Sequence, residues 1–177
     1  VVPTIVTIHD LIEYNVPEKF SKARMLYRKG ICDPLMAKRS DHILTVSKSS
    51  YNDIIKYLGV KPEKISLTLN ATDKSIFKKY NREVVEQTIA NKSLKYKEYL
   101  LFVGTIDYPG KNIRTVIDAF FNLRSRDELK GQKLVIIGKD GFNSQIIHDA
   151  VNASPFKKDV VFTGYLKDED LPKYYAG

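Results

Sequence analysis

The second half of the sequence repeats one pattern three times: an apolar stretch, a glycine, and then apolar residues at helical spacing. The apolar stretches are residues 99–103, 134–137 and 160–162, and the glycines that follow them are Gly104, Gly138 and Gly164. Strands that alternate with helices predict a parallel sheet flanked by helices, which is the α/β class. Ligands of such sheets bind at the carboxyl ends of the strands, where a glycine lets them approach the backbone. The pattern therefore constrains both the fold and the place of a site.

The turn after the first of these strands is a candidate anion site. Residues 99–112 run from an apolar strand through Gly104 and a polar turn to Lys111 and Asn112, which open an amphipathic helix. The helix N-terminus offers free N–H groups and a positive dipole end, and Lys111 adds a full charge, so a phosphate is the expected ligand. The turn is not a P-loop, because five residues separate Gly104 from Gly110 and Asn112 replaces the metal-binding hydroxyl.

The first part of the chain contains three more expected strands, at residues 3–8, 42–46 and 65–69. Ser47 is placed to cap a helix that should end at Gly59. Composition becomes polar after Asn70, so we expect a domain boundary there, with one domain over 1–70 and a second over 71–177. Because the chain opens inside a strand and has no initiating Met, we expect it to be a piece of a longer protein.

A basic segment over residues 19–39 supplies much of the formal net charge of +8. Its charges are interleaved with apolar residues, which predicts an amphipathic helical segment that Pro34 should kink or break. Two interpretations of this segment are equally plausible. It is either a solvated helix face or a surface that contacts anionic lipid or an acidic substrate. Nucleic acid is not expected as a partner, since no aromatic and basic platform accompanies the segment.

Several other chemistries find no support in the sequence. There is no Gly-x-Ser-x-Gly elbow, no dinucleotide-binding glycine motif, and no His and Cys cluster with metal-ligand spacing, so no metal cofactor is expected. Residues 168–170 (DED) are better explained as the start of a helix, capped by Asp168, than as a metal site. His9 directly follows the first strand, where a structural and a functional role are equally plausible. With a lone Cys32, no signal peptide and no apolar run of membrane-spanning length, a cytoplasmic location is expected.

Six stretches, taken in chain order, resemble the family 4 glycosyltransferases, which are retaining enzymes of GT-B architecture. They are residues 7–11 (TIHDL), 40–47 (SDHILTVS), 70–73 (NATD), 101–105 (LFVGT) with 110–112 (GKN), 134–138 (LVIIG) and 161–165 (VFTGY). The resemblance implies two Rossmann-like domains with parallel sheets. Both would be incomplete in this chain, since the family's later glutamate-bearing segment would lie beyond residue 177, and the piece would be inactive alone. The first domain would bind the acceptor, which would be a glycan or a lipid-linked molecule, and the second the nucleotide-sugar donor. The enzyme would act in cell-surface polysaccharide or glycolipid biosynthesis, at the inner membrane face if the basic segment touches lipid.

The resemblance also implies roles for individual residues. Lys111 would pair with the donor diphosphate and stabilise the departing nucleotide, and His9 would lie near the sugar, so these two are the expected catalytic residues. The further donor-binding residues would be Gly104, Thr105, Asn112, Gly138, Tyr165 and Leu166.

Two positions depart from the family pattern, because Thr105 and Gly110 stand where the family often has basic residues. Phosphate binding would then depend more heavily on Lys111. A non-catalytic nucleotide- or phosphate-binding α/β domain is the alternative function that these residues leave open, and a membrane-docking module with a degenerate site is a third.

Overall fold

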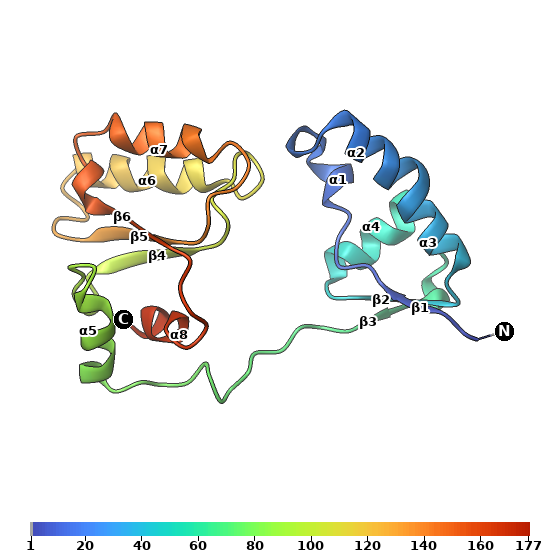
Figure 1. Cartoon of the computed structure of the whole chain (residues 1–177), viewed down its shortest axis with the longest axis horizontal. Coiled ribbons are helices and arrows are strands. Elements are labelled where there is room, and N and C mark those ends of the chain that lie inside the picture. The colour runs from blue at the N-terminus through green and yellow to red at the C-terminus, as the bar shows by residue number, and fades with distance from the viewer. Residues whose placement is uncertain (1) are drawn as a thin grey trace. The chain divides into compact units, whose positions relative to one another are not determined.

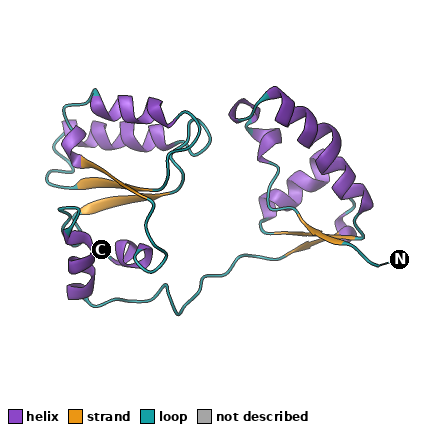
Figure 2. Cartoon of the chain, in the orientation of Figure 1, coloured by secondary structure: helices purple, strands orange, loops and turns teal. Residues whose placement is uncertain are grey.

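The computed structural model describes residues 2–177 and divides the chain into two compact units (Figure 1). Unit 1 runs to Thr72 and unit 2 from Asp73 to Gly177. Each unit combines one parallel three-stranded sheet with helices, as the colouring by secondary structure shows (Figure 2). The α/β class predicted from the sequence is confirmed in both units.

Unit 1 has a sheet in the order β1-β2-β3, and its helices lie on one side of that sheet (Figure 1). Its elements are β1 (Ile5–Thr7), α1 (Ile12–Asn15), α2 (Lys22–Tyr27), a π-helical turn (Arg28–Cys32), α3 (Asp33–Arg39), β2 (His42–Thr45), α4 (Lys48–Leu58) and β3 (Ile65–Leu67), with short 3-10 turns at Pro17–Lys19 and Pro62–Lys64.

The core of unit 1 forms where the sheet meets these helices. Val6, Ile43 and Ile65 are aligned across the three strands, and the last two are buried. Ile54 of α4 and Leu11 pack into the same core. This arrangement follows from the alternation of the strands, which places every second side chain on the helical side.

Helix α4 begins and ends as its sequence predicts. The Ser47 hydroxyl accepts a hydrogen bond from the Ser50 N–H at 3.0 Å, and Gly59 closes the helix in the left-handed conformation with φ of 63°. A side-chain oxygen at the N-cap satisfies an otherwise unpaired N–H group, and glycine adopts positive φ at little cost.

The helix does not break at Pro34, so the break that was expected as one of two outcomes is wrong. Residues 22–39 keep helical backbone angles throughout, and Pro34 lies in the first turn of α3. The hydrogen bonding changes just before the proline, where the Asp33 N–H donates to the Arg28 carbonyl in a π-helical turn. A wide turn accommodates a residue that has no N–H to donate, so the helix continues instead of ending.

Unit 2 has three layers, with α6 and α7 on one face of its sheet and α5 and α8 on the other (Figure 1). Its sheet has the order β4-β5-β6. The elements are α5 (Arg82–Ala90), β4 (Tyr99–Val103), α6 (Ile113–Ser125), β5 (Lys133–Ile137), α7 (Ser144–Asn152), β6 (Val160–Gly164) and α8 (Leu171–Ala176), with a 3-10 turn at Lys157–Asp159.

The central strand β5 joins the two cores of unit 2. Leu134 and Ile136 pack against α6 and α7, whereas Val135 and Ile137 pack against α5 and α8. All four side chains are buried. A parallel strand covered on both faces reads as a continuous apolar run, which explains why its sequence shows no alternation.

Candidate functional site

The carboxyl ends of the three strands of unit 2 meet at one edge of the sheet. The Gly104 N–H donates to the Ile137 carbonyl at 2.9 Å, and the Gly138 N–H donates to the Gly164 carbonyl at 3.0 Å. The three glycines singled out in the sequence are therefore neighbours, and we call this the glycine edge. An open parallel sheet binds its ligands at such an edge.

Close packing makes Gly138 indispensable at this edge. Its φ is +154°, and a Cβ atom at this position would lie 2.0 Å from the Gly104 carbonyl oxygen. That distance is a severe overlap with backbone, which cannot rotate away as a side chain could. Glycine is thus required here by contact, and the backbone of two strands becomes accessible to a ligand.

The loops that follow β4 and β5 are joined by backbone hydrogen bonds. Ile106 N–H donates to the Lys139 carbonyl, Gly141 N–H to the Ile106 carbonyl, and Tyr108 N–H to the Phe142 carbonyl, each at 2.9 Å. The two loops therefore form one rim above the glycine edge.

A pocket of about 310 Å³ opens at the glycine edge. Five residues expected at the donor site line it: Gly104, Thr105, Gly138, Tyr165 and Leu166. The other lining residues are Val103, Ile137, Lys139, Asp168 and Leu171. The pocket combines exposed backbone, apolar side chains and a few charged groups, as small-molecule sites commonly do.

Lys111 and Asn112 lie at the start of α6 and are not among the residues that line this pocket. Asn112 is the N-cap with φ of 50°, and its side-chain oxygen accepts a hydrogen bond from the Thr115 hydroxyl at 2.7 Å. Lys111 is exposed just before the helix. A cation beside a helix N-terminus favours binding of an anion. The role of Lys111 in binding phosphate stays a prediction.

His9 belongs to unit 1, in the loop between β1 and α1, where its side chain is exposed. Its backbone is held from α4, because the Ser50 hydroxyl donates to the His9 carbonyl at 2.8 Å. Ser50 is buried and accepts a hydrogen bond in turn from the Ser47 hydroxyl at 2.9 Å. A pair of linked hydroxyls therefore fixes the backbone of this loop.

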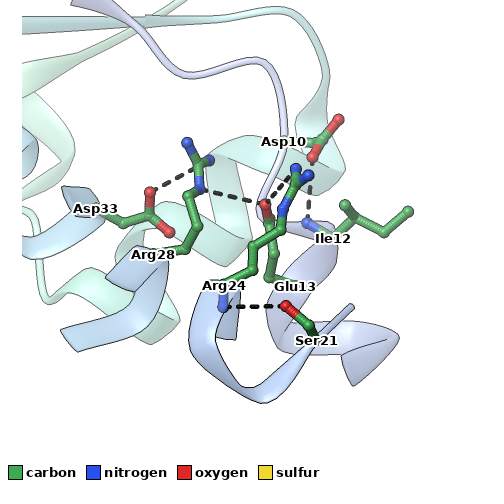
Figure 3. Close-up of polar contacts among 7 residues, drawn as sticks. All are labelled: Asp10, Ile12, Glu13, Ser21, Arg24, Arg28 and Asp33. Atoms are coloured by element: carbon green, nitrogen blue, oxygen red, sulfur yellow. Dashed lines mark hydrogen bonds and ion pairs between the residues drawn. The ribbon is translucent and has the colours of Figure 1, made fainter. Parts of the chain in front are cut away.

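The same loop leads into a partly buried ionic cluster, formed by Glu13, Arg24, Arg28 and Asp33 (Figure 3). Arg28 contacts Glu13 Oε1 and Asp33 Oδ1 at 3.2 Å each, and Arg24 lies 3.6 Å from Glu13 Oε1. Both carboxylate side chains are only 3% exposed. Burial raises the pKa of the Asp33 carboxyl, against the opposing effect of Arg28.

This cluster changes the interpretation of the basic segment. Arg24 and Arg28 contribute to its excess positive charge in the sequence, yet both pair with carboxylates of unit 1. The ammonium of Lys29 lies 4.6 Å from the centre of the Tyr14 ring. The charge that this surface offers to a partner is therefore smaller than the sequence alone indicates.

Two charged residues line the pocket although the sequence does not predict them there. Lys139 follows Gly138 directly, and its ammonium lies 4.9 Å from the centre of the Tyr165 ring. Asp168 accepts a hydrogen bond from the Tyr165 hydroxyl at 3.3 Å. Lys139 could have been predicted at the pocket, because it immediately follows a glycine at the end of a strand. Asp168 could not, because the pattern around it predicts a helix cap.

The helix-cap interpretation of Asp168 is wrong. Helix α8 begins at Leu171 and its N-cap is Asp170, whose carboxylate lies 2.8 Å from the Lys173 ammonium. An extra turn precedes the helix, and this turn leaves Asp168 at the pocket.

Within residues 2–177, no three His, Cys, Asp or Glu side chains are grouped so that they could hold a metal ion. Over the same residues, no helix has the length and apolar character required to cross a membrane.

Comparison with known proteins identifies the family. The family model described as Glycosyltransferase Family 4 matches residues 1–75, and the one described as Glycosyl transferases group 1 matches residues 97–177. The two matches together cover most of the chain. The chain belongs to the family 4 glycosyltransferases, as its motifs suggested.

Two curated relatives are mannosyltransferases. The chain is 27% identical over 173 residues to the O-antigen chain mannosyltransferase B of Escherichia coli, covering 97% of this chain and 44% of that relative. It is 31% identical over 116 residues to the O-antigen chain mannosyltransferase RfbU of Salmonella typhimurium, covering 63% of this chain and 27% of the relative. The chain thus spans less than half the length of these relatives.

Solved structures agree on the fold. The crystal structure of Anabaena Alr3699/HepE in complex with UDP and glucose aligns with a TM-score of 0.78 at 17% identity. The alignment covers 98% of this chain and 44% of that one. The Rossmann-like, GT-B assignment made from the motifs is confirmed.

Proposed function

We propose that the protein transfers a sugar from a nucleoside-diphosphate donor to a glycan or lipid-linked acceptor, with retention at the anomeric carbon. The observation that carries this proposal is the pocket at the glycine edge, which gathers Gly104, Thr105, Gly138, Tyr165 and Leu166. The mannosyltransferases of O-antigen chains among its relatives support a role in cell-surface polysaccharide assembly.

The chemistry to be done is the departure of a nucleoside diphosphate from the anomeric carbon. Negative charge develops on the leaving diphosphate, and fixed donors in a water-poor site stabilise it best. The Gly104–Thr105 backbone would line the phosphate, and Lys111 with the N-terminus of α6 would neutralise it. His9 would contact the sugar from the first domain. None of these steps requires a metal ion.

The proposal is tested with the complete protein, a panel of nucleotide sugars and a polysaccharide or glycolipid acceptor. Lys111→Ala should weaken nucleoside-diphosphate binding at least about tenfold, because it removes a charge-assisted contact to phosphate. Lys130→Ala, an exposed lysine of a turn in unit 2, is the matched control and should bind normally. Calorimetry measures both, and unchanged affinity in Lys111→Ala would remove that residue from the site.

Transfer itself separates the main proposal from its alternative. Binding of a nucleoside diphosphate without sugar transfer to any acceptor would favour a non-catalytic nucleotide-binding domain. Where transfer occurs, the anomeric configuration of the product, read by NMR, tests retention; an inverted product would contradict that part.

We further propose that α2 and α3 touch an anionic membrane. Four large apolar residues are exposed along this helical segment: Leu26, Tyr27, Ile31 and Leu35. The exposed basic residues Lys22, Lys38 and Arg39 lie on the same helices. Apolar side chains beside cations suit the surface of an anionic bilayer, where each basic residue near the surface contributes about 1 kcal/mol.

Cosedimentation with vesicles tests the membrane contact. Lys22→Glu with Lys38→Glu should reduce binding to anionic vesicles about tenfold or more, and Leu26→Ser with Ile31→Ser should reduce it as well. Arg24 and Arg28 are left intact because they hold the ionic cluster. Ile146→Ser, an exposed apolar residue of α7, is the control. Equal sedimentation of all variants would leave the segment as a solvated face.

A further inference from the structure

Three side chains at the glycine-edge pocket form a connected set, which we call the Lys139–Tyr165–Asp168 cluster. The Lys139 ammonium lies over the Tyr165 ring at 4.9 Å from its centre, and the Tyr165 hydroxyl donates to Asp168 Oδ1 at 3.3 Å. All three line the same pocket. A cation, an aromatic ring and a carboxylate thus face the space where the proposed function places a nucleoside.

Asp168 retains capacity to bind a ligand. It is not the cap of α8, and its two acidic neighbours have partners outside the pocket: Asp170 with Lys173 at 2.8 Å, and Glu169 with Lys167 at 3.9 Å. A carboxylate offers about four acceptor positions on two oxygens. The Tyr165 hydroxyl occupies one of them, so Asp168 is the carboxylate that can accept further hydrogen bonds within this pocket.

The rest of the pocket suits a flat ring. Val103, Ile137, Leu166 and Leu171 give it an apolar lining. Tyr165 is 63% exposed, and its ring offers a face on which a base can stack. Stacking alone does not discriminate among bases, because every base has a π-face. Selectivity must therefore come from the two charged groups.

The edges of the four bases differ in what they offer a carboxylate. Guanine presents two adjacent donors, N1–H and the N2 amino group, beside the O6 acceptor. Uracil presents N3–H between two carbonyl oxygens, whereas adenine and cytosine present an amino group beside an acceptor nitrogen. A carboxylate pairs fully with guanine and meets a repelling acceptor on each of the others.

We propose that the Lys139–Tyr165–Asp168 cluster selects guanosine diphosphate as the nucleotide of the donor. Asp168 accepts from guanine N1–H and N2–H, the Lys139 ammonium donates to O6, and Tyr165 stacks on the base. This inference rests on the proposed function, since it assigns a base to the same donor pocket.

Calorimetry on the complete protein with GDP, IDP, ADP, CDP and UDP tests the inference. GDP should bind at least about tenfold more tightly than each of the others. The comparison with IDP is the sharpest, because IDP lacks only the N2 amino group. Asp168→Asn should lose about 10- to 100-fold of GDP affinity and bind GDP and IDP equally, while ADP, CDP and UDP keep their wild-type affinities. Glu169→Gln, a neighbouring carboxylate outside the pocket, is the control and should retain the GDP preference.

Each other outcome overturns the inference in a recognisable way. Equal affinity for GDP and UDP refutes guanine selection and leaves the glycosyltransferase proposal standing. An Asp168→Asn variant that loses all five nucleotides equally shows that Asp168 maintains the pocket and does not read the base; thermal unfolding of the variant reports whether it is folded. Failure of the wild-type protein to bind any nucleoside diphosphate refutes the proposed function as well.

Discussion

The two units build the same kind of sheet and stabilise it differently. In unit 2, β5 is buried on both faces by apolar residues, and the glycine edge brings backbone groups together. In unit 1, the described helices lie on one side of the sheet (Figure 1). Arg28 joins two carboxylates that are each 3% exposed, Glu13 of α1 and Asp33 of α3 (Figure 3).

The difference shows how each unit positions its candidate site. In unit 2 the pocket is formed by the backbone of closely packed strands. Only substitutions that change the volume of a packed residue should therefore disturb it. In unit 1 a hydroxyl contact holds the loop of His9, and ion pairs hold the adjacent helix α1. Changes in hydrogen bonding or charge should therefore disturb this region. The following variants test this contrast, beginning with the largest expected effect.

Arg28→Met should be the most damaging substitution in unit 1. It leaves Glu13 and Asp33 buried without their shared partner, which costs about 3–5 kcal/mol of unfolding free energy. The deficit should shrink as pH falls, because protonation removes the unpaired charges. Denaturant unfolding measures both effects.

A matched control and a rescue sharpen the Arg28 result. Arg82→Met breaks an exposed ion pair with Glu86 and should have little effect. Adding Glu13→Gln and Asp33→Asn to Arg28→Met should restore much of the stability. If Arg28→Met is as mild as Arg82→Met, the ionic cluster does not stabilise unit 1.

Gly138→Ala should destabilise unit 2 by about 3 kcal/mol, because the new methyl group overlaps the Gly104 carbonyl. Gly131→Ala is the control. That residue has φ of +81°, and a methyl group added there would have no other atom within 4 Å, so this variant bears only backbone strain of about 1 kcal/mol. Thermal or denaturant unfolding measures both variants. Equal losses would mean that the glycine edge tolerates a side chain.

Ser50→Ala should cost about 1 kcal/mol by removing the hydrogen bond to the His9 carbonyl. Amide hydrogen exchange should accelerate in residues 9–11 and remain unchanged in unit 2. Ser49→Ala, an exposed serine of the same helix, should leave exchange as in the wild type. Identical exchange in both variants would argue against a hydroxyl that fixes this loop.

Tyr99→Phe tests the smallest expected effect, which is on how the free energy of unfolding of unit 2 changes at high pH. Burial raises the pKa of the Tyr99 hydroxyl from 10.0 to about 12, and this hydroxyl donates to the Tyr174 carbonyl at 2.6 Å. The folded state therefore holds the proton more tightly than the unfolded one. Its stabilising contribution is complete below about pH 10 and is lost between about pH 10 and 12. Unfolding at about pH 9 and 11 should show a steeper loss in the wild type than in the variant; parallel losses would contradict this.

Local patterns predicted most of the fold. Strand β4 occupies residues 99–103 as its apolar run indicates, and Ser47 and Gly59 bound α4 as their cap preferences require. The glycine edge followed from the strand–glycine–helix repeat, because parallel strands must bring their carboxyl ends together. These features depend on neighbours in sequence.

Long-range contacts of side chains were beyond such patterns. The contact of Lys139 with Tyr165 joins loops after different strands, and the Glu13–Arg28 pair joins α1 to the turn after α2. The predicted break at Pro34 was wrong because a proline pattern does not reveal the wide turn before it. The prediction at Asp168 was wrong because one extra turn moves the helix start to Leu171.

The backbone hydrogen bonds between the loops after β4 and β5 bear on how this scaffold can be re-engineered. Ile106, Tyr108 and Gly141 each donate across the two loops at 2.9 Å. An insertion or deletion in one loop would shift the register against the other and leave several amide groups unpaired. A loop graft intended to alter donor choice should therefore exchange both loops together, as a single cassette.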